Sequence, residues 1–141
     1  MIEFFFEDFL SFDFPRDKFI KKTTYIVDKE GFKPSFINVV FCSDNYLLGI
    51  NKEHLQHDFF TDIITFNYNS ENLISGDLFI SIDRVKENAA TQKTNFLLEL
   101  ERVIYHGVLH LCGFNDKSTI EIKQMRQKED LYLNHDVSRE T

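Results

Sequence analysis

NFLLELERVIYHGVLHLCGFND, residues 95–116, is the stretch that decides the fold, because most of it predicts a helix that is apolar on nearly every side. A helix of that kind is usually buried. On a helical wheel its polar side chains other than Glu101 share one stripe, within about 60° of Glu99: Asn95, Glu99, Arg102, His106 and His110. We therefore expect residues 95–112 to form a central helix, buried except for this narrow stripe.

The two histidines of the stripe have the spacing of metal ligands. His106 and His110 are four residues apart, so their side chains share one face of the helix and can bind one ion at about 2.0–2.1 Å. Gly113 predicts the end of the helix, because glycine readily adopts the left-handed conformation that turns the chain back. Asp116 then stands where a third ligand is expected. Two histidines and one carboxylate leave a coordination position open, which favours a catalytic zinc over a structural one.

A protein without any metal is the alternative at this point. A histidine pair at this spacing, taken alone, is more typical of a hydrogen-bonded core than of a ligand set. The glycine and the carboxylate that follow the pair favour the metal site. Elemental analysis of the purified protein separates the two hypotheses.

The rest of the chain predicts one α/β (α+β) domain over residues 1–141. We expect a roughly four-stranded mixed sheet packed on several helices, with the metal site on the central C-terminal helix. Strands are predicted at 2–8, 35–43, 61–69 and 76–83, and helices at 15–29, 45–55, 84–93, 95–112 and 118–134. Asp44 is expected to cap the second helix, and Ser118 with Glu121 has the spacing of a capping box.

The composition is typical of a globular protein of the cytoplasm. A hydrophobic content of 43% excludes disorder, and the net charge of −7 argues against binding nucleic acid by bulk electrostatics alone. The two cysteines lie in apolar stretches, which predicts buried, reduced thiols rather than a disulfide framework. The N-terminal segment is acidic, unlike a signal peptide, and no stretch approaches the roughly 20 apolar residues of a membrane span.

Basic residues of the C-terminal half have two interpretations. They could form a local surface for nucleic acid, or they could be an ordinary solvated helix face, since Glu87, Glu121, Glu129 and Asp130 are mixed with them. The residues in question are Arg84, Lys86, Lys93, Lys117, Lys123, Arg126 and Lys128.

The ligand spacing resembles that of the metzincin metalloproteases, whose motif is H-E-x-x-H-x-x-G-x-x-H. The glutamate of that motif is the general base that activates the zinc-bound water. Gly107 stands in its place here. The resemblance therefore keeps the metal ligands and argues against peptide hydrolysis.

A closer resemblance is to the YbeY family of rRNA-maturation endoribonucleases, whose signature is H-G-x-L-H-L-x-G-[YF]-D-H. Seven positions agree: His106, Gly107, Leu109, His110, Leu111, Gly113 and Phe114. Upstream, the family has an Asn followed ten residues later by Thr-Asp, matched by Asn51 and Thr61-Asp62, and a Gly-Asp matched by Gly76-Asp77. The resemblance covers at least residues 50–116.

This resemblance implies one zinc ion, a cytoplasmic location, and an endoribonuclease acting on single-stranded RNA in 16S rRNA 3′-end maturation and ribosome quality control. Its partners would be precursor rRNA and the small ribosomal subunit. His106 and His110 carry over as zinc ligands, and Asp116 aligns with the third histidine of the family. The family typically has an arginine where Leu55 stands, and His57, Arg84 and Arg102 are the groups available to replace it.

Four further residues are predicted to support the site by orienting ligands or contacting substrate: Glu99, Arg102, Thr61 and Asp62. Glu99 is expected to hold a ligand histidine through its other ring nitrogen, whereas Thr61 and Asp62 could equally cap a turn. The general base is not identified by the sequence. A ribosome-associated binding factor with a structural or weakly catalytic zinc, suggested by Leu55, and a metallopeptidase remain as alternative functions.

Overall fold

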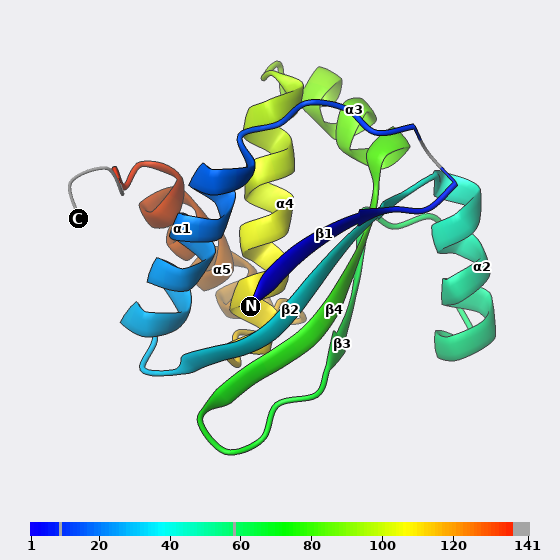
Figure 1. The fold of residues 1–141 in the computed structure, drawn as a ribbon. Coiled ribbons are helices and arrows are strands. Elements are labelled where there is room, and N and C mark those ends of the chain that lie inside the picture. The colour runs from blue at the N-terminus through cyan, green and yellow to red at the C-terminus, as the bar shows by residue number, and fades with distance from the viewer. Residues whose placement is uncertain (9, 58, 137–141) are drawn as a thin grey trace.

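Four strands form one mixed sheet in the computed structural model, which describes residues 1–8, 10–57 and 59–136. In chain order they are β1 (Ile2–Phe6), β2 (Lys33–Cys42), β3 (Ile63–Asn67) and β4 (Leu73–Ser81). Their order across the sheet is β1-β2-β4-β3 (Figure 1). Strands β1, β2 and β4 are parallel, and β3 runs antiparallel to β4. The predicted fold class is confirmed.

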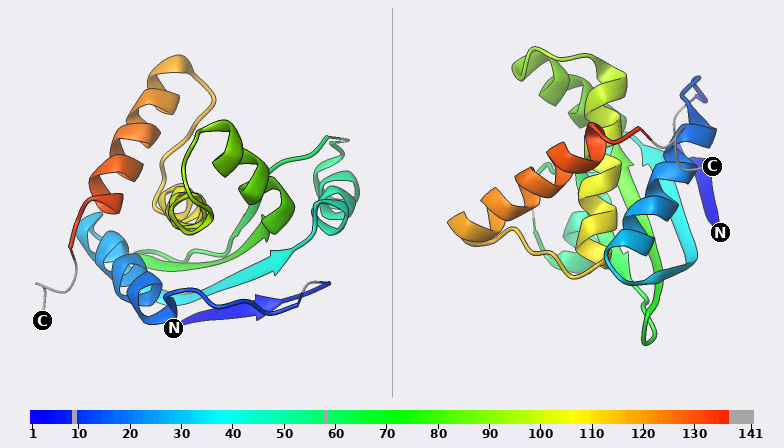
Figure 2. Two further views of the ribbon diagram at one scale, coloured as in Figure 1. Left: turned by 90° about the horizontal axis from the view of Figure 1, so that it is seen from above. Right: turned by 90° about the vertical axis from the view of Figure 1, so that its left-hand side faces the viewer.

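The helices lie mainly on one face of this sheet. They are α1 (Arg16–Lys29), α2 (Asp44–Leu55), α3 (Ile82–Thr91), α4 (Phe96–Leu111) and α5 (Thr119–Leu133). Figure 2 shows α4 above the sheet with α1 beside it, while α5 and α3 rise on either side of α4, away from the strands. α2 lies at one end of the sheet, where its first residue, Asp44, contacts Arg84 of α3.

The central position of α4 follows from its apolar sequence, as predicted. Leu100, Ile104 and Val108 have no exposed surface, and they belong to the main core with strand residues such as Leu78. A smaller core beneath α2 contains Cys42. Both cysteines are buried and free, which confirms that prediction, and burial raises the pKa of each thiol to about 12.

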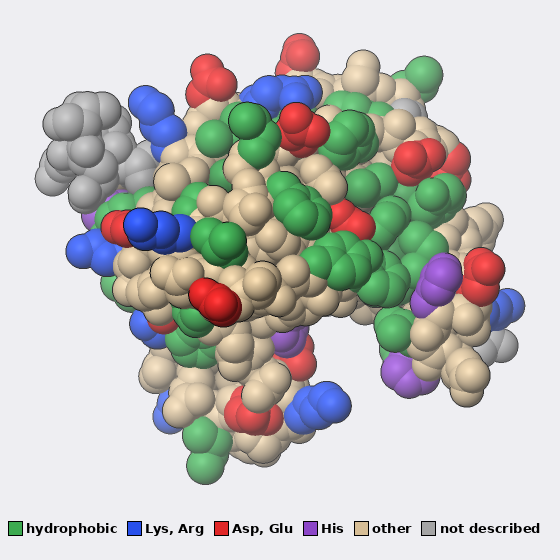
Figure 3. All heavy atoms as spheres, turned by 60° about the horizontal axis from the view of Figure 1, so that its bottom comes forward, with side chains coloured by type: hydrophobic (Ala, Val, Ile, Leu, Met, Phe, Trp, Pro, Cys, Tyr) green, Lys and Arg blue, Asp and Glu red, His purple; other side chains and the backbone are tan. Residues whose placement is uncertain are grey.

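The other face of the sheet retains exposed hydrophobic side chains, among them Phe5, Phe36 and Tyr68. Figure 3 shows hydrophobic side chains gathered on one side of the molecule, next to a hollow in its outline. In the described part of the chain, the helices therefore cover the sheet unequally, and the buried α4 is the element on which a site can be built.

Gly107 allows α4 to pack closely on the sheet. A Cβ atom at this position would lie 2.6 Å from Cδ1 of Ile63 and 3.0 Å from Cδ2 of Leu78. Any larger side chain would therefore require the side chains of Ile63 on β3 and Leu78 on β4 to move. Position 107 faces the sheet rather than the histidine stripe, so a glutamate could not act there as it does in the metzincins.

The end of α4 has the geometry that the glycine predicts. Gly113 has a φ of +103°, its N–H donates to the oxygen of His110 at 3.0 Å, and the N–H of Phe114 donates to the oxygen of Leu109 at 3.0 Å. This pair of hydrogen bonds is a Schellman motif. The capping box of Ser118 and Glu121 at the start of α5 is also confirmed.

Two local predictions are wrong. The cap of α2 is Ser43, whose hydroxyl accepts the Tyr46 N–H at 3.1 Å; Asp44 is the first helical residue and instead accepts hydrogen bonds from Ser81 and Arg84. The strand predicted at 76–83 begins at Leu73, because the hairpin pairs Ser70 with Leu73, and it ends at Ser81, which caps α3.

Candidate metal centre

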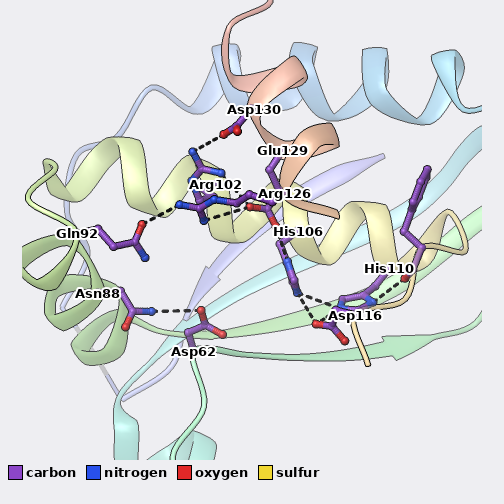
Figure 4. Close-up of polar contacts among 11 residues, drawn as sticks. Asp62, Asn88, Gln92, Arg102, His106, His110, Asp116, Arg126, Glu129 and Asp130 are labelled. Carbon is purple, nitrogen blue, oxygen red and sulfur yellow. Dashed lines mark hydrogen bonds and ion pairs between the residues drawn. The ribbon is translucent and has the colours of Figure 1, made fainter. Parts of the chain in front are cut away.

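Three side chains converge where α4 ends. Nε2 of His106, Nε2 of His110 and Oδ2 of Asp116 form a triangle with sides of 3.0, 3.1 and 3.2 Å (Figure 4). The histidines come from successive turns of α4, and the turn at Gly113 returns Asp116 to them. All three side chains are partly buried. The structure thus brings together the three residues that the sequence proposes as ligands.

The Nδ1 atom of each histidine, which faces away from the triangle, has a hydrogen-bond partner of its own. Nδ1 of His110 lies 2.9 Å from the carbonyl oxygen of Phe114, which can only accept, so Nδ1 carries the proton and Nε2 has a free lone pair. Nδ1 of His106 lies 2.6 Å from Oε2 of Glu129. A carboxylate at this place holds the proton on Nδ1 and leaves Nε2 for a metal.

This donor set fits a divalent cation. Lone pairs of two imidazoles and one carboxylate face each other at 3.0–3.2 Å, an arrangement that repels itself unless a cation or a proton lies between them. Atoms so spaced can all reach one zinc ion at about 2.0–2.2 Å, the usual length of these bonds. Burial by itself lowers the pKa of His106, but the hydrogen bond and charge of Glu129, with Asp62 and Asp116, outweigh it and raise that pKa.

Glu129 is the residue of the site that sequence reasoning missed. Its side chain is 5% exposed, and it binds Arg102 at 3.0 Å as well as His106. From the sequence, Glu129 is one of the acidic residues whose mixture with basic ones favours an ordinary solvated helix face. The sequence does contain a signal for its position. Glu129 lies four residues after Met125 and three before Tyr132, so all three side chains share the inner face of α5.

Glu99 and Arg102 lie near the centre without contacting the ligand triangle. Glu99 is 3% exposed, and its Oε1 has no hydrogen-bond partner among the described residues, so the expected role of holding a histidine falls to Glu129 instead. Burial raises the pKa of Glu99, more than nearby Arg102 lowers it. Arg102 joins α4 to α5 through Glu129 and, at 2.8 Å, Asp130.

Thr61 and Asp62 lie just before β3. The Thr61 hydroxyl donates to the oxygen of Ile63 at 3.4 Å, which is a local turn contact. The backbone oxygen of Asp62 accepts the Ser81 N–H at 2.9 Å, and its Oδ2 accepts from Nδ2 of Asn88 at 3.3 Å. Burial raises the pKa of Asp62, although His106 opposes the shift.

Two cavities meet at the triangle. The first, which we name the ligand-side pocket, has a volume of about 570 Å³. The second, which we name the α3–α4–α5 cleft, has a volume of about 770 Å³. The two share Asp62, His106 and Asp116. The ligand-side pocket alone is lined by His110, Thr61, Leu55, His57, Phe59 and Lys117. The cleft alone is lined by Glu99, Arg102, Lys123 and Arg126. A metal at the triangle would therefore be accessible from two sides.

The position of Leu55 matters because the related family has an arginine there. Leu55 is 43% exposed and lines the ligand-side pocket, where His57 also lies with its ring stacked on Phe59 at 5.0 Å. Arg84 lies elsewhere, in an ion pair with Asp44 at 2.8 Å, and Arg102 lines the cleft. Of the three groups available to replace the arginine, only His57 lines this pocket.

The basic residues of the C-terminal half have different surroundings, some in the two cavities and some in ion pairs. Lys117 lines the ligand-side pocket, and Lys123 and Arg126 line the cleft. Arg84 and Lys128 are instead engaged in ion pairs, the latter with Glu30 at 3.0 Å. The cations nearest the triangle are thus distributed over the two cavities that meet there.

Comparisons with known proteins place this geometry in a family context. The family model described as "Endoribonuclease YbeY" matches residues 8–136. An endoribonuclease YbeY of Parabacteroides distasonis is 50% identical over 108 residues, covering 77% of this chain and 76% of the relative. The corresponding protein of Amoebophilus asiaticus is 42% identical over 134 residues, covering 94% and 90%.

A solved structure is also similar. A Thermotoga maritima protein determined in solution superposes with a TM-score of 0.66 at 27% identity, covering 94% of this chain and 87% of that one. None of the helices in the described part of the chain combines the length and hydropathy that crossing a bilayer requires.

Proposed function

Because this chain belongs to the endoribonuclease YbeY family, we propose that it is a zinc-dependent endoribonuclease that cleaves single-stranded RNA at the triangle of His106, His110 and Asp116. The proposal includes the setting that the resemblance implies: 16S rRNA 3′-end maturation and ribosome quality control in the cytoplasm, with the small ribosomal subunit as partner. The observation that carries it is the convergence of three ligand atoms within 3.2 Å of one another.

His106, His110 and Asp116 would hold the ion and leave a coordination position open toward the cavities. A bound zinc supplies an acidic water and polarises a phosphoryl oxygen. The protein contributes the orientation of the ligands: Glu129 and the Phe114 carbonyl each hold one imidazole through Nδ1. Such partners also make the imidazoles stronger ligands.

Asp62 is our candidate for the group that holds a proton during hydrolysis. It lines the ligand-side pocket together with all three ligands, and burial raises its pKa, which makes its carboxylate a better proton acceptor. Asn88 orients it through one oxygen. The expected signature of this role is that Asp62→Asn lowers kcat while zinc affinity is retained.

The ligand-side pocket also has groups that suit a single strand. The stacked pair of His57 and Phe59 offers aromatic faces to unpaired bases, and Phe59 is 56% exposed. Lys117 in the same pocket can contact a phosphate. A duplex would keep its bases stacked and could not use these faces.

A chelator-sensitive cleavage assay tests the proposal. Zinc-loaded protein, purified to homogeneity, is incubated with a labelled single-stranded RNA that carries the 3′ end of precursor 16S rRNA. We expect cleavage that is lost with chelator and lost in His106→Ala, but kept in the matched control His54→Ala on α2, which lies outside the triangle. Cleavage that persists in His106→Ala would point to a contaminating nuclease and contradict the proposal.

Leu55 favours a second candidate, a ribosome-associated binding factor whose zinc is structural or weakly catalytic. An apolar side chain at this edge of the pocket cannot steady a phosphate as an arginine does. Under this alternative the protein binds the small subunit but cleaves RNA poorly, and Leu55→Arg raises the rate. A metallopeptidase is disfavoured by the packing of position 107 against β3 and β4.

A further inference from the structure

The α3–α4–α5 cleft has a buried acceptor that the metal centre does not use. The Oε1 atom of Glu99 is fully buried and has no hydrogen-bond partner in the described part of the chain. The side chain is 3% exposed and lines the cleft. A buried, unpartnered carboxylate oxygen costs free energy unless a donor reaches it. Glu99 is therefore placed to accept from a ligand that enters the cleft.

Apolar side chains form part of the lining of the cleft that contains Glu99. Val103 and Met125 line the cleft from α4 and α5 and are almost fully buried, while Ile122 lies nearer the surface with 54% exposed. A cavity of about 770 Å³ is large enough for a nucleotide. The ligand therefore has an apolar body and hydrogen-bond donors at its inner end.

The mouth of the cleft carries positive charge. Lys123 and Arg126 line it from α5, and both are exposed. Arg126 donates to Oε1 of Gln92 at 3.2 Å, which joins α5 to the end of α3 across the cleft (Figure 4). Because this contact is at the surface, an entering phosphate can replace it at little cost.

The cleft is continuous with the metal centre. His106, Asp116 and Asp62 line both cavities. An RNA strand with one nucleotide in the cleft can therefore extend its backbone past the triangle into the ligand-side pocket.

We propose that the α3–α4–α5 cleft binds a guanine base of the RNA substrate next to the cleaved bond, with Glu99 accepting from its N1–H and N2–H groups. This inference rests on the proposed function for its substrate class, and it adds a base preference to that function.

Guanine is the base whose hydrogen-bonding edge fits a carboxylate. An ionised carboxylate only accepts, and guanine presents two adjacent N–H donors on its Watson–Crick edge. Adenine and cytosine present an amino group beside an acceptor nitrogen, and uracil presents one N–H between two carbonyl oxygens. Each of those acceptors would face the carboxylate, which disfavours the other three bases.

Calorimetric binding of nucleoside 5′-monophosphates to the zinc-loaded protein tests the proposal without requiring cleavage. Guanosine, inosine and adenosine monophosphates share the phosphate, so differences among them report the base. We expect guanosine monophosphate to bind most tightly. Inosine monophosphate, which lacks the N2 amino group, is expected to bind at least about tenfold more weakly, as for loss of one hydrogen bond to a charged group.

The matched variants are Glu99→Gln and Glu53→Gln, the second on the exposed surface of α2. Glu99→Gln should lose at least about tenfold in affinity for guanosine monophosphate, and Glu53→Gln should lose none. Unchanged zinc affinity and a cooperative unfolding transition, with a midpoint no lower than that of the unmodified protein, show that Glu99→Gln is folded. Equal binding of the three nucleotides, no binding, or full affinity in Glu99→Gln would overturn the proposal.

Cleavage mapping separates this inference from the proposed function. With active enzyme we expect cuts next to guanosine, and a loss of that preference in Glu99→Gln. Cuts without base preference would contradict the guanine site and leave the ribonuclease intact. Selective guanosine monophosphate binding without any RNA cleavage would contradict the ribonuclease and support the base site.

Discussion

Glu99 and Glu101 lie two residues apart on α4, and their side chains face opposite sides of that helix. Both are almost fully buried, at 3% and 4% exposed. Glu101 faces α1, where Lys22 binds it at 3.1 Å and Lys18 at 3.4 Å, and it also accepts from the hydroxyl of Tyr105 on α4 at 2.8 Å. Glu99 faces the α3–α4–α5 cleft with an oxygen that has no partner among the described residues.

Burial alone therefore does not separate a structural charge from a functional one; the partners do. The Glu101 cluster neutralises its own charge, so it stabilises the contact between α1 and α4 and needs nothing from outside. On the cleft side, Glu129 is neutralised by Arg102 and used to hold His106, while Glu99 remains open to a ligand. Substitutions at four positions, Lys22, Glu129, Glu99 and Glu101, can break or sharpen this contrast.

Lys22→Met is expected to have the largest effect, on stability. The substitution leaves Glu101 buried with only the half-exposed Lys18 as a cation, and removes the donor that Lys22 gives to the oxygen of Leu133. Removing one partner of a buried pair costs about 3 kcal/mol or more in free energy of unfolding. Denaturant unfolding of the chelator-treated protein measures it.

The metal centre should not respond to the same change. Zinc affinity of Lys22→Met, measured by competition with a chromophoric chelator, is expected to equal that of the unmodified protein. Lys22→Arg keeps a cation at this position and serves as the control for charge. A loss of zinc affinity in Lys22→Met would mean that the two sides of α4 are not independent.

Glu129→Gln is expected to have the next largest effect, on metal binding. Loss of the carboxylate weakens the hold on Nδ1 of His106, and changes of this kind cost about 10–100-fold in metal affinity. Asp130→Asn is the matched control, because Asp130 binds Arg102 but not a histidine. Equal zinc affinity in the two variants would refute the role assigned to Glu129.

The pH dependence of zinc binding sharpens the same test. Protonated His106 cannot ligate, and its pKa is raised by Glu129 despite the opposing effect of burial. In the unmodified protein, affinity therefore falls as pH drops through a value above the ordinary 6.5. Glu129→Gln lowers that pKa, so its affinity begins to fall at a lower pH. The difference between the two proteins should be largest above the raised pKa of His106 and should narrow as pH falls below it.

Glu99→Gln is expected to have the smallest effect, with the opposite sign. It removes the charge of a buried carboxylate whose Oε1 has no hydrogen-bond partner among the described residues, which should raise the free energy of unfolding by about 1 kcal/mol at neutral pH. The folded pKa of Glu99 is raised, so ionisation destabilises the fold as pH rises from the unfolded pKa through the folded one. The advantage of the variant should therefore grow with pH over that range and then level off.

Glu101→Gln completes the comparison, since it should destabilise where Glu99→Gln stabilises. Unfolding curves of both variants at pH 4 and pH 7 provide the measurement. Destabilisation by Glu99→Gln at neutral pH would show that the carboxylate is structural after all, and would remove the contrast between the two sides of α4.

The sequence by itself determined the parts of this protein that depend on neighbours along the chain. The burial of α4, its end at Gly113 and the convergence of His106, His110 and Asp116 follow from helical periodicity and one glycine turn, which involve separations of ten residues or fewer. The fold class followed in the same way from alternating strand and helix patterns. The limits of caps and strands are less well determined by the sequence. Ser43 and Asp44 are both good helix caps, and Ile82, the first residue of α3, has a side chain that also suits a strand.

Only the tertiary structure decided which groups from distant segments meet at the centre. Glu129 reaches His106 from 23 residues away, and Asn88 reaches Asp62 from 26. The opposite surroundings of Glu99 and Glu101 also depend on where α1, α3 and α5 pack around α4. A periodic pattern tells which residues are buried but not what they are buried against, because that is set by the packing of separate helices.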